Sequence, residues 1–297
     1  MKNSYSTREL ADLLSVNEST VKRWADSRFI ECVKTKGGHR KFSIKSILRF
    51  IHENQMNVPS LSLAEFDRKD VQAHLSAGFV DVLVPTLKEA ALQGDSNEVQ
   101  RLLRTGLISQ PDIILLYTQL LFPALVDIGR DWEKGTVRVD AEHLATQAIK
   151  SALLRFQSDI HLKETNGLSA VVSCFEGETH DIAITCIAGY LTSQGWRVYH
   201  LGQDIPTDDL SFFIRSKKPN LVAISADIVD AERKFVFGIN NKIVPAAKKA
   251  GAMTIAGGLQ IPSRFSGRLK CDMLSDSISD IMAIHHNMTK EAAEAQT

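Results

Sequence analysis

From residue 166 onward the chain alternates short apolar runs with longer amphipathic segments, and this alternation restricts the fold more than any other feature. The apolar runs predict strands at Leu168–Cys174, Arg197–Leu201, Leu221–Ala226 and Met253–Ala256, with a shorter one at Cys271–Leu274. Helical patterns lie between them, with expected caps at Asp181, Pro206-Thr207 and Asp230. Strands that alternate with helices predict a parallel sheet with right-handed crossovers.

The expected strand order is flavodoxin-like, and such sheets bind ligands beyond the carboxyl ends of their strands. Glu178-Thr179-His180-Asp181 follows the first run at this edge. A carboxylate two residues before His180 can accept one ring N–H, which makes the imidazole a better metal ligand. Ser225 ends the third run and Gly257-Gly258 follow the fourth, so both are expected near His180. The same residues are also compatible with a histidine that merely lies on a strand-to-helix loop.

The first 55 residues are basic, although the whole chain has no net charge. They hold eleven Lys/Arg and six Asp/Glu, a local charge of +5. Ser6 or Thr7 can cap a first helix, a turn at Ser15-Val16-Asn17 follows, and a second helix runs from Glu18 to Trp24. This order is typical of a helix-turn-helix. We expect Trp24 in the core of the module rather than at DNA bases.

Two segments of this module are expected to contact double-stranded DNA. The second helix exposes Ser19, Thr20, Lys22 and Arg23. The next segment carries two glycines between cations, a pattern that predicts a hairpin wing against phosphates, with contacts from Gly38, His39, Arg40 and Lys41. Ser43 is expected to cap a further helix over residues 44–51. The alternative is a small basic three-helix module that binds protein.

Residues 56–75 read as a linker, and residues 76–165 as a four-helix antiparallel bundle. Expected helix starts are Asp95 or Ser96, Gln110-Pro111 and Asp140, with a kink at Pro123. Trp132 ends one helix, and Glu142-His143 begin the next after nine intervening residues. An indole with a carboxylate and an imidazole nearby can stack on a nucleoside base and bond its polar groups.

Composition excludes several classes of protein. Apolar residues make up 44% and charged residues 24%, as is ordinary for a soluble protein. No uninterrupted apolar run approaches the roughly 18 residues of a membrane span, and no signal peptide is visible. Cys32, Cys174, Cys186 and Cys271 are too widely spaced for a disulfide framework or a zinc motif. We therefore expect a cytoplasmic protein without membrane contact. The chain shows no phosphate loop or hydrolase triad, and we expect no enzyme activity.

Three motifs resemble known families. Glu178-Thr179-His180-Asp181-Ile182-Ala183 resembles the Asp/Glu-x-His-x-x-Gly signature of Rossmann-like cobalamin-binding domains. Thr7-Arg8-Glu9-Leu10-Ala11 and Gly38-His39-Arg40-Lys41-Phe42 resemble the winged helix-turn-helix of MerR-family regulators. The Trp-x9-Glu-His spacing is similar to that of the cobalamin-dependent photoreceptor repressors of the CarH/LitR type. The resemblance implies a MerR-type domain over 1–55, a cobalamin cap over 76–165 and a cobalamin-binding domain over 166–297.

The resemblance also implies residue roles and a function. His180 binds the lower face of cobalt, and the nucleotide tail enters a slot lined by Ser225, Gly257 and Gly258. Further cofactor contacts are expected from Glu178, Asp181, Trp132, Glu142 and His143, the last three around the adenosyl group of adenosylcobalamin. The implied protein is a transcriptional repressor of operator DNA that forms a homotetramer in the dark and separates in light.

Three positions depart from the family pattern. Ala183 replaces a glycine, Asp227 stands where the family has leucine, and Glu133 stands where some members have a second cobalt-binding histidine. Two alternatives therefore remain: a MerR-type regulator with a degenerate cobalamin fold that senses another ligand or none, and a corrinoid carrier for methyl transfer.

Overall fold

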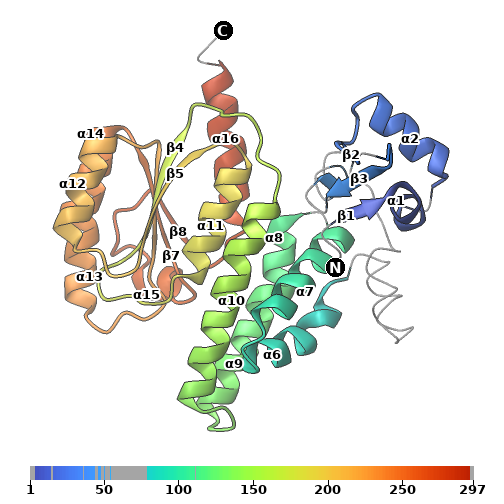
Figure 1. The fold of residues 1–297 in the computed structure, drawn as a ribbon. Helices are drawn as coiled ribbons and strands as arrows, with labels where there is room; N and C mark the ends of the chain where they lie inside the picture. Colours follow the sequence, from blue (N-terminus) through green and yellow to red (C-terminus); the bar gives the residue numbers. More distant parts are fainter. Residues whose placement is uncertain are drawn as a thin grey trace. The chain divides into compact units, whose positions relative to one another are not determined.

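We analysed a computed structural model of the chain, which describes residues 4–14, 16–35, 37–43, 46–47, 50, 54, 79–110 and 112–294. The chain divides into two compact units, Met1–His161 and Leu162–Thr297, and each is described by itself (Figure 1). The expected linker 56–75 and much of the helix expected over 44–51 lie outside the described residues. The boundaries expected between the domains stay predictions.

The N-terminal module has the predicted helix-turn-helix. Its elements are β1 (Ser4–Ser6), α1 (Thr7–Leu13), α2 (Glu18–Asp26), β2 (Val33–Lys34) and β3 (Arg40–Ser43). The strands form an antiparallel sheet in the order β1-β3-β2. Ser6 caps α1 through a reciprocal pair of bonds with Glu9, as the sequence indicates. Trp24 packs against Phe50 with ring centroids 4.9 Å apart, so its expected place in the core is confirmed.

The helical bundle follows in the same unit. It comprises η1 (Asp81–Leu83), α6 (Val84–Leu92), α7 (Ser96–Ser109), α8 (Ile113–Leu116), the π-helical η2 (Tyr117–Leu121), α9 (Phe122–Glu133) and α10 (Val139–Asp159). Asp95 caps α7 by accepting from the backbone N–H groups of Asn97 and Glu98, as expected. The other two expected starts are wrong. Asp112 caps α8, and Arg138 occupies the N-cap of α10, which leaves Asp140 in the first turn.

The segment Ile113–Glu133 is the one described helix that is long and apolar enough to cross a membrane. Tyr117, Leu120 and Leu121 are fully buried in the bundle, as in a core helix, whereas Val126 is 47% exposed. Pro123 falls in the first turn of α9, directly after the π-helical turn, and such turns accommodate a residue that cannot donate a helical hydrogen bond.

The second unit is a parallel α/β domain. Its elements are β4 (Ser169–Cys174), α11 (Ile182–Ser193), β5 (Arg197–Gly202), α12 (Thr207–Lys217), β6 (Leu221–Ser225), α13 (Glu232–Gly238), η3 (Ile239–Ile243), α14 (Val244–Ala250), β7 (Met253–Gly257), α15 (Ile261–Phe265), β8 (Met273–Ser275) and α16 (Asp280–Glu294). The order β5-β4-β6-β7-β8 confirms the predicted flavodoxin-like arrangement. Asp181 and Pro206 are the expected N-caps, but α13 begins after Ala231, so the cap expected at Asp230 is wrong.

Helices cover both faces of this sheet. α11 and α16 lie on one face, and α12, α13 and α14 lie on the other (Figure 1). The second face contains an extensive apolar core, in which Phe235 packs edge-on against both Phe175 and Phe265. Because burial of apolar area is the main stabilising term in folding, this core fixes the strands whose ends form the site.

The register of the sheet places four strand ends in one row. Cys174 pairs with Ser225, Ser225 with Gly257, and Gly257 with Ser275. The loops that follow these residues therefore leave the same edge of the sheet. The parallel arrangement therefore brings the predicted site residues together, although the ends of the first and last strands, Cys174 and Ser275, are about 100 positions apart in the chain.

Candidate functional site

His180 lies on the loop between β4 and α11 with a buried carboxylate beside it. Its Nδ1 is 2.6 Å from Oε1 of Glu178, and its backbone N–H donates to the same oxygen at 2.7 Å. The Glu178 side chain is only 2% exposed, whereas that of His180 is 57% exposed. The carboxylate accepts the Nδ1 proton, so Nε2 is the ring nitrogen that would bind a metal.

The second oxygen of Glu178 binds a different loop. Oε2 accepts the backbone N–H groups of Asp227 at 2.7 Å and Ile228 at 2.9 Å, directly after β6. Burial by itself would raise the pKa of Glu178, but the bonds from the His180 ring and from the Ile228 and His180 backbone lower it to about 2. Glu178 is therefore a carboxylate that fixes the ring and the neighbouring loop together.

Glu176 holds the loop between β4 and α11, which carries His180, from its other side. The sequence analysis did not identify this residue. Its Oε2 accepts from the N–H and hydroxyl of Thr207 at 3.2 and 2.8 Å, and its Oε1 lies 2.8 Å from Nζ of Lys234. Asp204 also accepts the backbone N–H of Gly177 at 2.9 Å. Its position two residues before Glu178 could have indicated a role, but its partners Thr207 and Lys234 lie 31 and 58 residues away in the chain.

Ser225, Gly257 and Gly258 lie where the sequence placed them, at the ends of β6 and β7. Ser225 is 5% exposed, and among the described residues its hydroxyl has no hydrogen-bond partner. Gly258 has φ +152°, and a Cβ there would lie 2.2 Å from the carbonyl oxygen of Ala226. At Gly257, by contrast, a Cβ would make only ordinary van der Waals contacts, the nearest at 3.7 Å. The edge thus offers an unused hydroxyl beside backbone without side chains.

Asp227 adds a second acid to this edge. Burial raises the pKa of Asp227, and the charge of Glu178 raises it further. Its Oδ1 lies 3.4 Å from the backbone nitrogen of Leu259, which follows the glycine pair. Asp181 is buried at the N-cap of α11, without a capping bond from its side chain, and the half-buried Ala183 lies in the first turn of that helix.

These residues fit a corrinoid cobalt. One imidazole with a buried carboxylate on its second nitrogen is a suitable metal donor, and the hydroxyl of the largely buried Ser225 beside glycine backbone suits an inserted tail. Across the residues that the structure describes, no three His, Cys, Asp or Glu side chains form a metal-binding group.

In the bundle, Trp132 and His143 line a hollow of about 680 Å³ together with Gly135, Val137, Arg138, Val139 and Asp140. The turn between α9 and α10 is fixed because the carbonyl of Asp131 accepts the N–H groups of Thr136 and Val137. Trp132 is 47% exposed. Glu142 does not line the hollow, but its Oε2 lies 2.7 Å from Nδ1 of His143. The three residues expected to act together are thus close in space.

The four residues of α2 that were predicted to contact DNA differ in their exposure to solvent. Ser19, Lys22 and Arg23 are exposed on α2 and Thr20 is half-buried. Lys22 pairs with Glu18 across one helical turn at 3.6 Å. Such an exposed pair is weak, so Lys22 can exchange it for a phosphate.

The wing is the hairpin between β2 and β3. Gly38 has φ +78°, and its N–H donates to the carbonyl of Thr35 at 2.9 Å. His39 is exposed, Lys41 is half-buried, and Arg40 is only 18% exposed and lies 2.5 Å from Oδ1 of Asp26. Arg40 thus joins β3 to the end of α2. This contact was not foreseen, because the two residues are 14 positions apart.

Comparisons with known proteins agree with this arrangement. Residues 4–55 match the family described as a helix-turn-helix domain, and residues 83–155 and 168–263 match two families described as B12 binding domain. The chain is 33% identical over 110 residues to the HTH-type transcriptional repressor CarH of Myxococcus xanthus. That match covers 37% of this chain and 36% of the repressor, so it spans about a third of that relative.

Corrinoid proteins are similar over a longer part of the chain. Trimethylamine corrinoid protein 1 of Methanosarcina mazei is 20% identical over 68% of this chain and 94% of its own length. The solved monomethylamine corrinoid protein of Methanosarcina barkeri has the same fold, with a TM-score of 0.56 at 14% identity, over 67% of this chain and 94% of that one. The chain thus combines a helix-turn-helix domain with two B12 binding domains, the composition of a cobalamin-binding, DNA-binding regulator.

Proposed function

We propose that this protein is a MerR-type transcriptional repressor whose oligomerisation and operator affinity are controlled by adenosylcobalamin and light. The observation that carries the proposal is the buried Glu178 carboxylate on Nδ1 of His180, in a chain whose recognition helix also exposes Lys22 and Arg23. The similarity to the repressor CarH supports a regulatory output, and a cytoplasmic location accords with DNA as the partner.

Each residue has a role in this proposal. His180 would hold the cobalt through Nε2, and Glu178 would fix the orientation of the ring. Ser225 bonds the nucleotide tail beside Gly257 and Gly258. Adenosylcobalamin, when bound, supplies a cobalt–carbon bond that light cleaves. In the bundle, Trp132 stacks on the adenosyl group, and the Glu142–His143 pair accepts and donates hydrogen bonds at its polar atoms.

Assembly sets the DNA affinity. In the dark form a homotetramer presents several helix-turn-helix domains to operator half-sites, and linked binding raises affinity without any new contact. After illumination Trp132 loses its stacking partner, the subunits separate, and single domains bind too weakly. Lys22, Arg23 and the wing contact phosphates, so operator binding falls steeply with salt.

The decisive experiment is size-exclusion chromatography with absorbance detection, in the dark and after illumination, with adenosylcobalamin added to the full-length protein. We expect a coloured tetramer in the dark and a smaller coloured species in light. Trp132→Ala should reduce dark assembly more than corrinoid binding. A colourless protein, or a coloured one whose size is the same in both conditions, would refute the proposal.

A second candidate is a DNA-binding regulator whose cobalamin fold senses another ligand or none. Ala183 and Glu133 favour it, since Ala183 adds a methyl group where the family pattern has glycine, and Glu133 stands where some members have a second cobalt-binding histidine. A dark spectrum of the protein mixed with adenosylcobalamin separates the two. If no corrinoid is bound, this candidate replaces the first.

A third candidate is a corrinoid carrier for methyl transfer. The similarity to a trimethylamine corrinoid protein over nearly all of that protein favours it. Methyl transfer to this chain by a partner methyltransferase would support the carrier function. Specific operator binding without methyl transfer would exclude it.

A further inference from the structure

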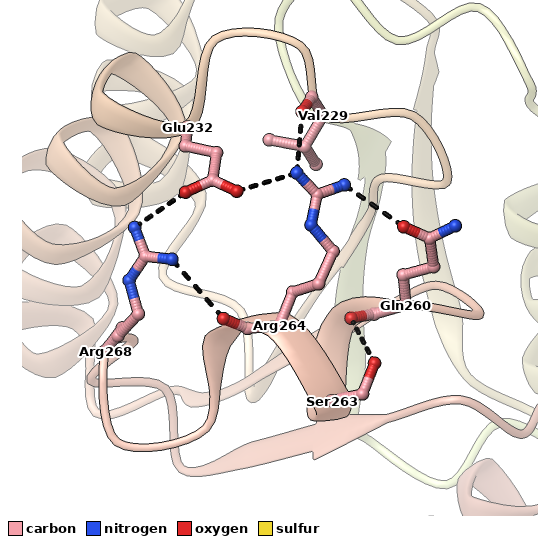
Figure 2. A network of polar contacts seen from close by, with 6 residues as sticks. All are labelled: Val229, Glu232, Gln260, Ser263, Arg264 and Arg268. Atoms are coloured by element: carbon pink, nitrogen blue, oxygen red, sulfur yellow. Dashed lines mark hydrogen bonds and ion pairs between the residues drawn. The ribbon is translucent and has the colours of Figure 1, made fainter.

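Two loops leave the sheet beside Ser225 and Gly257, and one arginine joins them. The first loop follows β6 and contains Val229, and the second follows β7 and contains Gln260. Arg264 extends from α15 between them (Figure 2). Its Nη1 donates to Oε1 of Gln260 at 3.1 Å, and its Nη2 donates to the carbonyl oxygen of Val229 at 3.3 Å.

Glu232 anchors this arginine from a third element. Nη2 of Arg264 lies 2.7 Å from Oε1 of Glu232, at the start of α13, and Nη2 of Arg268 lies 2.9 Å from Oε2 of the same residue (Figure 2). The guanidinium of Arg264 therefore binds three acceptors from the two loops and α13. The donors of a guanidinium are spread over a planar fork and reach separated acceptors, whereas the donors of a lysine all lie on one nitrogen.

The bonded loop is the one that Glu178 holds. Glu178 accepts the N–H groups of Asp227 and Ile228, and Arg264 binds the carbonyl of Val229, the next residue. Residues 227–229 are thus fixed from two sides, by Glu178 on the loop that carries His180 and by Arg264 on α15. At the ends of the two strands, the N–H of Ala226 donates to the carbonyl of Gly257 at 2.9 Å. The side chain of Asp227 also joins the two loops, because its Oδ1 accepts the backbone N–H of Leu259 at 3.4 Å.

We propose that Arg264 is a positioning residue that sets the separation of these two loops, and that it thereby makes the site prefer corrinoids with a nucleotide tail over corrinoids without one. The inference rests on the proposed cobalamin binding and names the part of the corrinoid that the site selects. Arg264 itself does not contact the cofactor. It acts through the loops on either side of Ser225 and Gly257.

The network contributes little to overall stability. Arg264 is 35% exposed, Glu232 38% and Arg268 45%, and ion pairs at such positions add little to the free energy of unfolding. The apolar core under the loops has contacts of its own, including Phe265 against Phe235, although Arg264 and Arg268 also lie over the Phe265 ring. Substitution of Arg264 therefore changes ligand selectivity while the melting temperature stays nearly constant, and the two effects are separable.

The test compares cobalamin, which has the tail, with cobinamide, which lacks it. Both are titrated by absorbance into full-length wild type, Arg264→Gln, Arg264→Lys and Arg268→Gln, and melting temperatures are measured without ligand. We expect Arg264→Gln to bind cobalamin about tenfold more weakly with cobinamide affinity unchanged. Arg264→Lys should lie between. Arg268→Gln is the matched control, because Arg268 has no bond to Val229 or Gln260, and it should match wild type.

The inference is overturned if Arg264→Gln keeps the wild-type ratio of the two affinities, whether both are unchanged or both fall. Should this variant not fold, Glu232→Gln removes the anchor of the guanidinium and is expected to lower cobalamin affinity in the same direction. Wild type that binds neither corrinoid would instead refute the proposed function. The two failures are thus distinguishable in one set of titrations.

Discussion

Nδ1 of His180 and Oε1 of Glu178 lie 2.6 Å apart, and the same oxygen accepts the backbone N–H of His180. The ring orientation is therefore set by the protein alone. A ligand that arrives at Nε2 meets an imidazole that has already lost its rotational freedom, and this preorganisation raises affinity. Most of the following predictions depend on this pair or on the loops that hold it.

Removal of the imidazole should abolish stable corrinoid retention. His180→Ala removes the imidazole that would bind cobalt, so we expect the protein to lose colour on gel filtration and cobalamin affinity to fall by more than the about 100-fold typical of partner mutations. The measurement is absorbance after desalting. His286→Ala, an exposed histidine of α16, is the control and should retain the cofactor. Equal retention by both variants would contradict the assignment of His180.

Replacement of the partner carboxylate should weaken the site without removing it. Glu178→Gln keeps the shape of the side chain but removes the negative charge that faces Nδ1–H of His180. It also places an amide nitrogen, which is a donor, against donors of the protein. We expect cobalamin affinity to fall about 10- to 100-fold. Isothermal titration measures this change. Affinity equal to wild type would mean that the charge on Glu178 has no role in ligation.

Glu176 should make stability depend on pH in the acidic range. Bonds from Lys234, then from Thr207, lower the pKa of Glu176 from 4.5 to about 2. Because its pKa is lower in the folded state, the carboxylate stabilises the fold fully above about pH 4.5, and this contribution is lost as pH falls toward 2.

We therefore expect Glu176→Gln to lower the free energy of unfolding by about 1–2 kcal/mol at pH 7 and by progressively less below pH 4.5. Urea unfolding at several pH values measures the difference. Glu291→Gln, an exposed position of α16, should have no effect. A difference independent of pH would show that the loss is one of shape and not of charge.

The two adjacent glycines should respond differently to alanine. At Gly258 a Cβ would lie 2.2 Å from the carbonyl oxygen of Ala226, and φ is +152°, so Gly258→Ala should lower the melting temperature clearly. At Gly257 the nearest atom is 3.7 Å away, so Gly257→Ala should fold normally and weaken only cobalamin binding. Thermal unfolding without ligand separates them. Equal melting temperatures for the two variants would argue against the backbone geometry at Gly258.

Arg23 should contribute to DNA binding through a phosphate. Arg23→Ala should weaken operator binding at every sequence and reduce the slope of log affinity against log salt by about 1. Fluorescence anisotropy at several salt concentrations measures the slope. Lys270→Ala, an exposed cation of the other unit, is the control. An unchanged slope for Arg23→Ala would move the phosphate contact to other residues of the module.

The sequence predicted the elements well because their signals are local. The five strands follow from apolar runs, and the His180–Glu178 contact follows from a spacing of two residues on one loop. Helix starts were less accurate: Asp230 and Asp140 are not caps although both residue types favour that position. Several polar residues compete at each of these starts, and backbone angles set by the whole fold select one.

The parts that could not be predicted are contacts between distant segments. Glu178 reaches Asp227 over 49 positions, Glu176 reaches Lys234 over 58, and Arg264 reaches Val229 over 35. Nothing in the local pattern distinguishes these acids and arginines from solvent-exposed ones. Their roles become visible only when the parallel register places the loops beside one another.

That register has a consequence for how proteins of this kind can diverge. Side chains alternate between the two faces of a strand, so a one-residue insertion within β6 would turn Ser225 away from its present side and slide its pairing with Gly257. An insertion in a loop beyond the edge would do neither. Descendants of such a domain can therefore acquire new ligands by changing loop length, while the lengths of the strands beneath must stay constant.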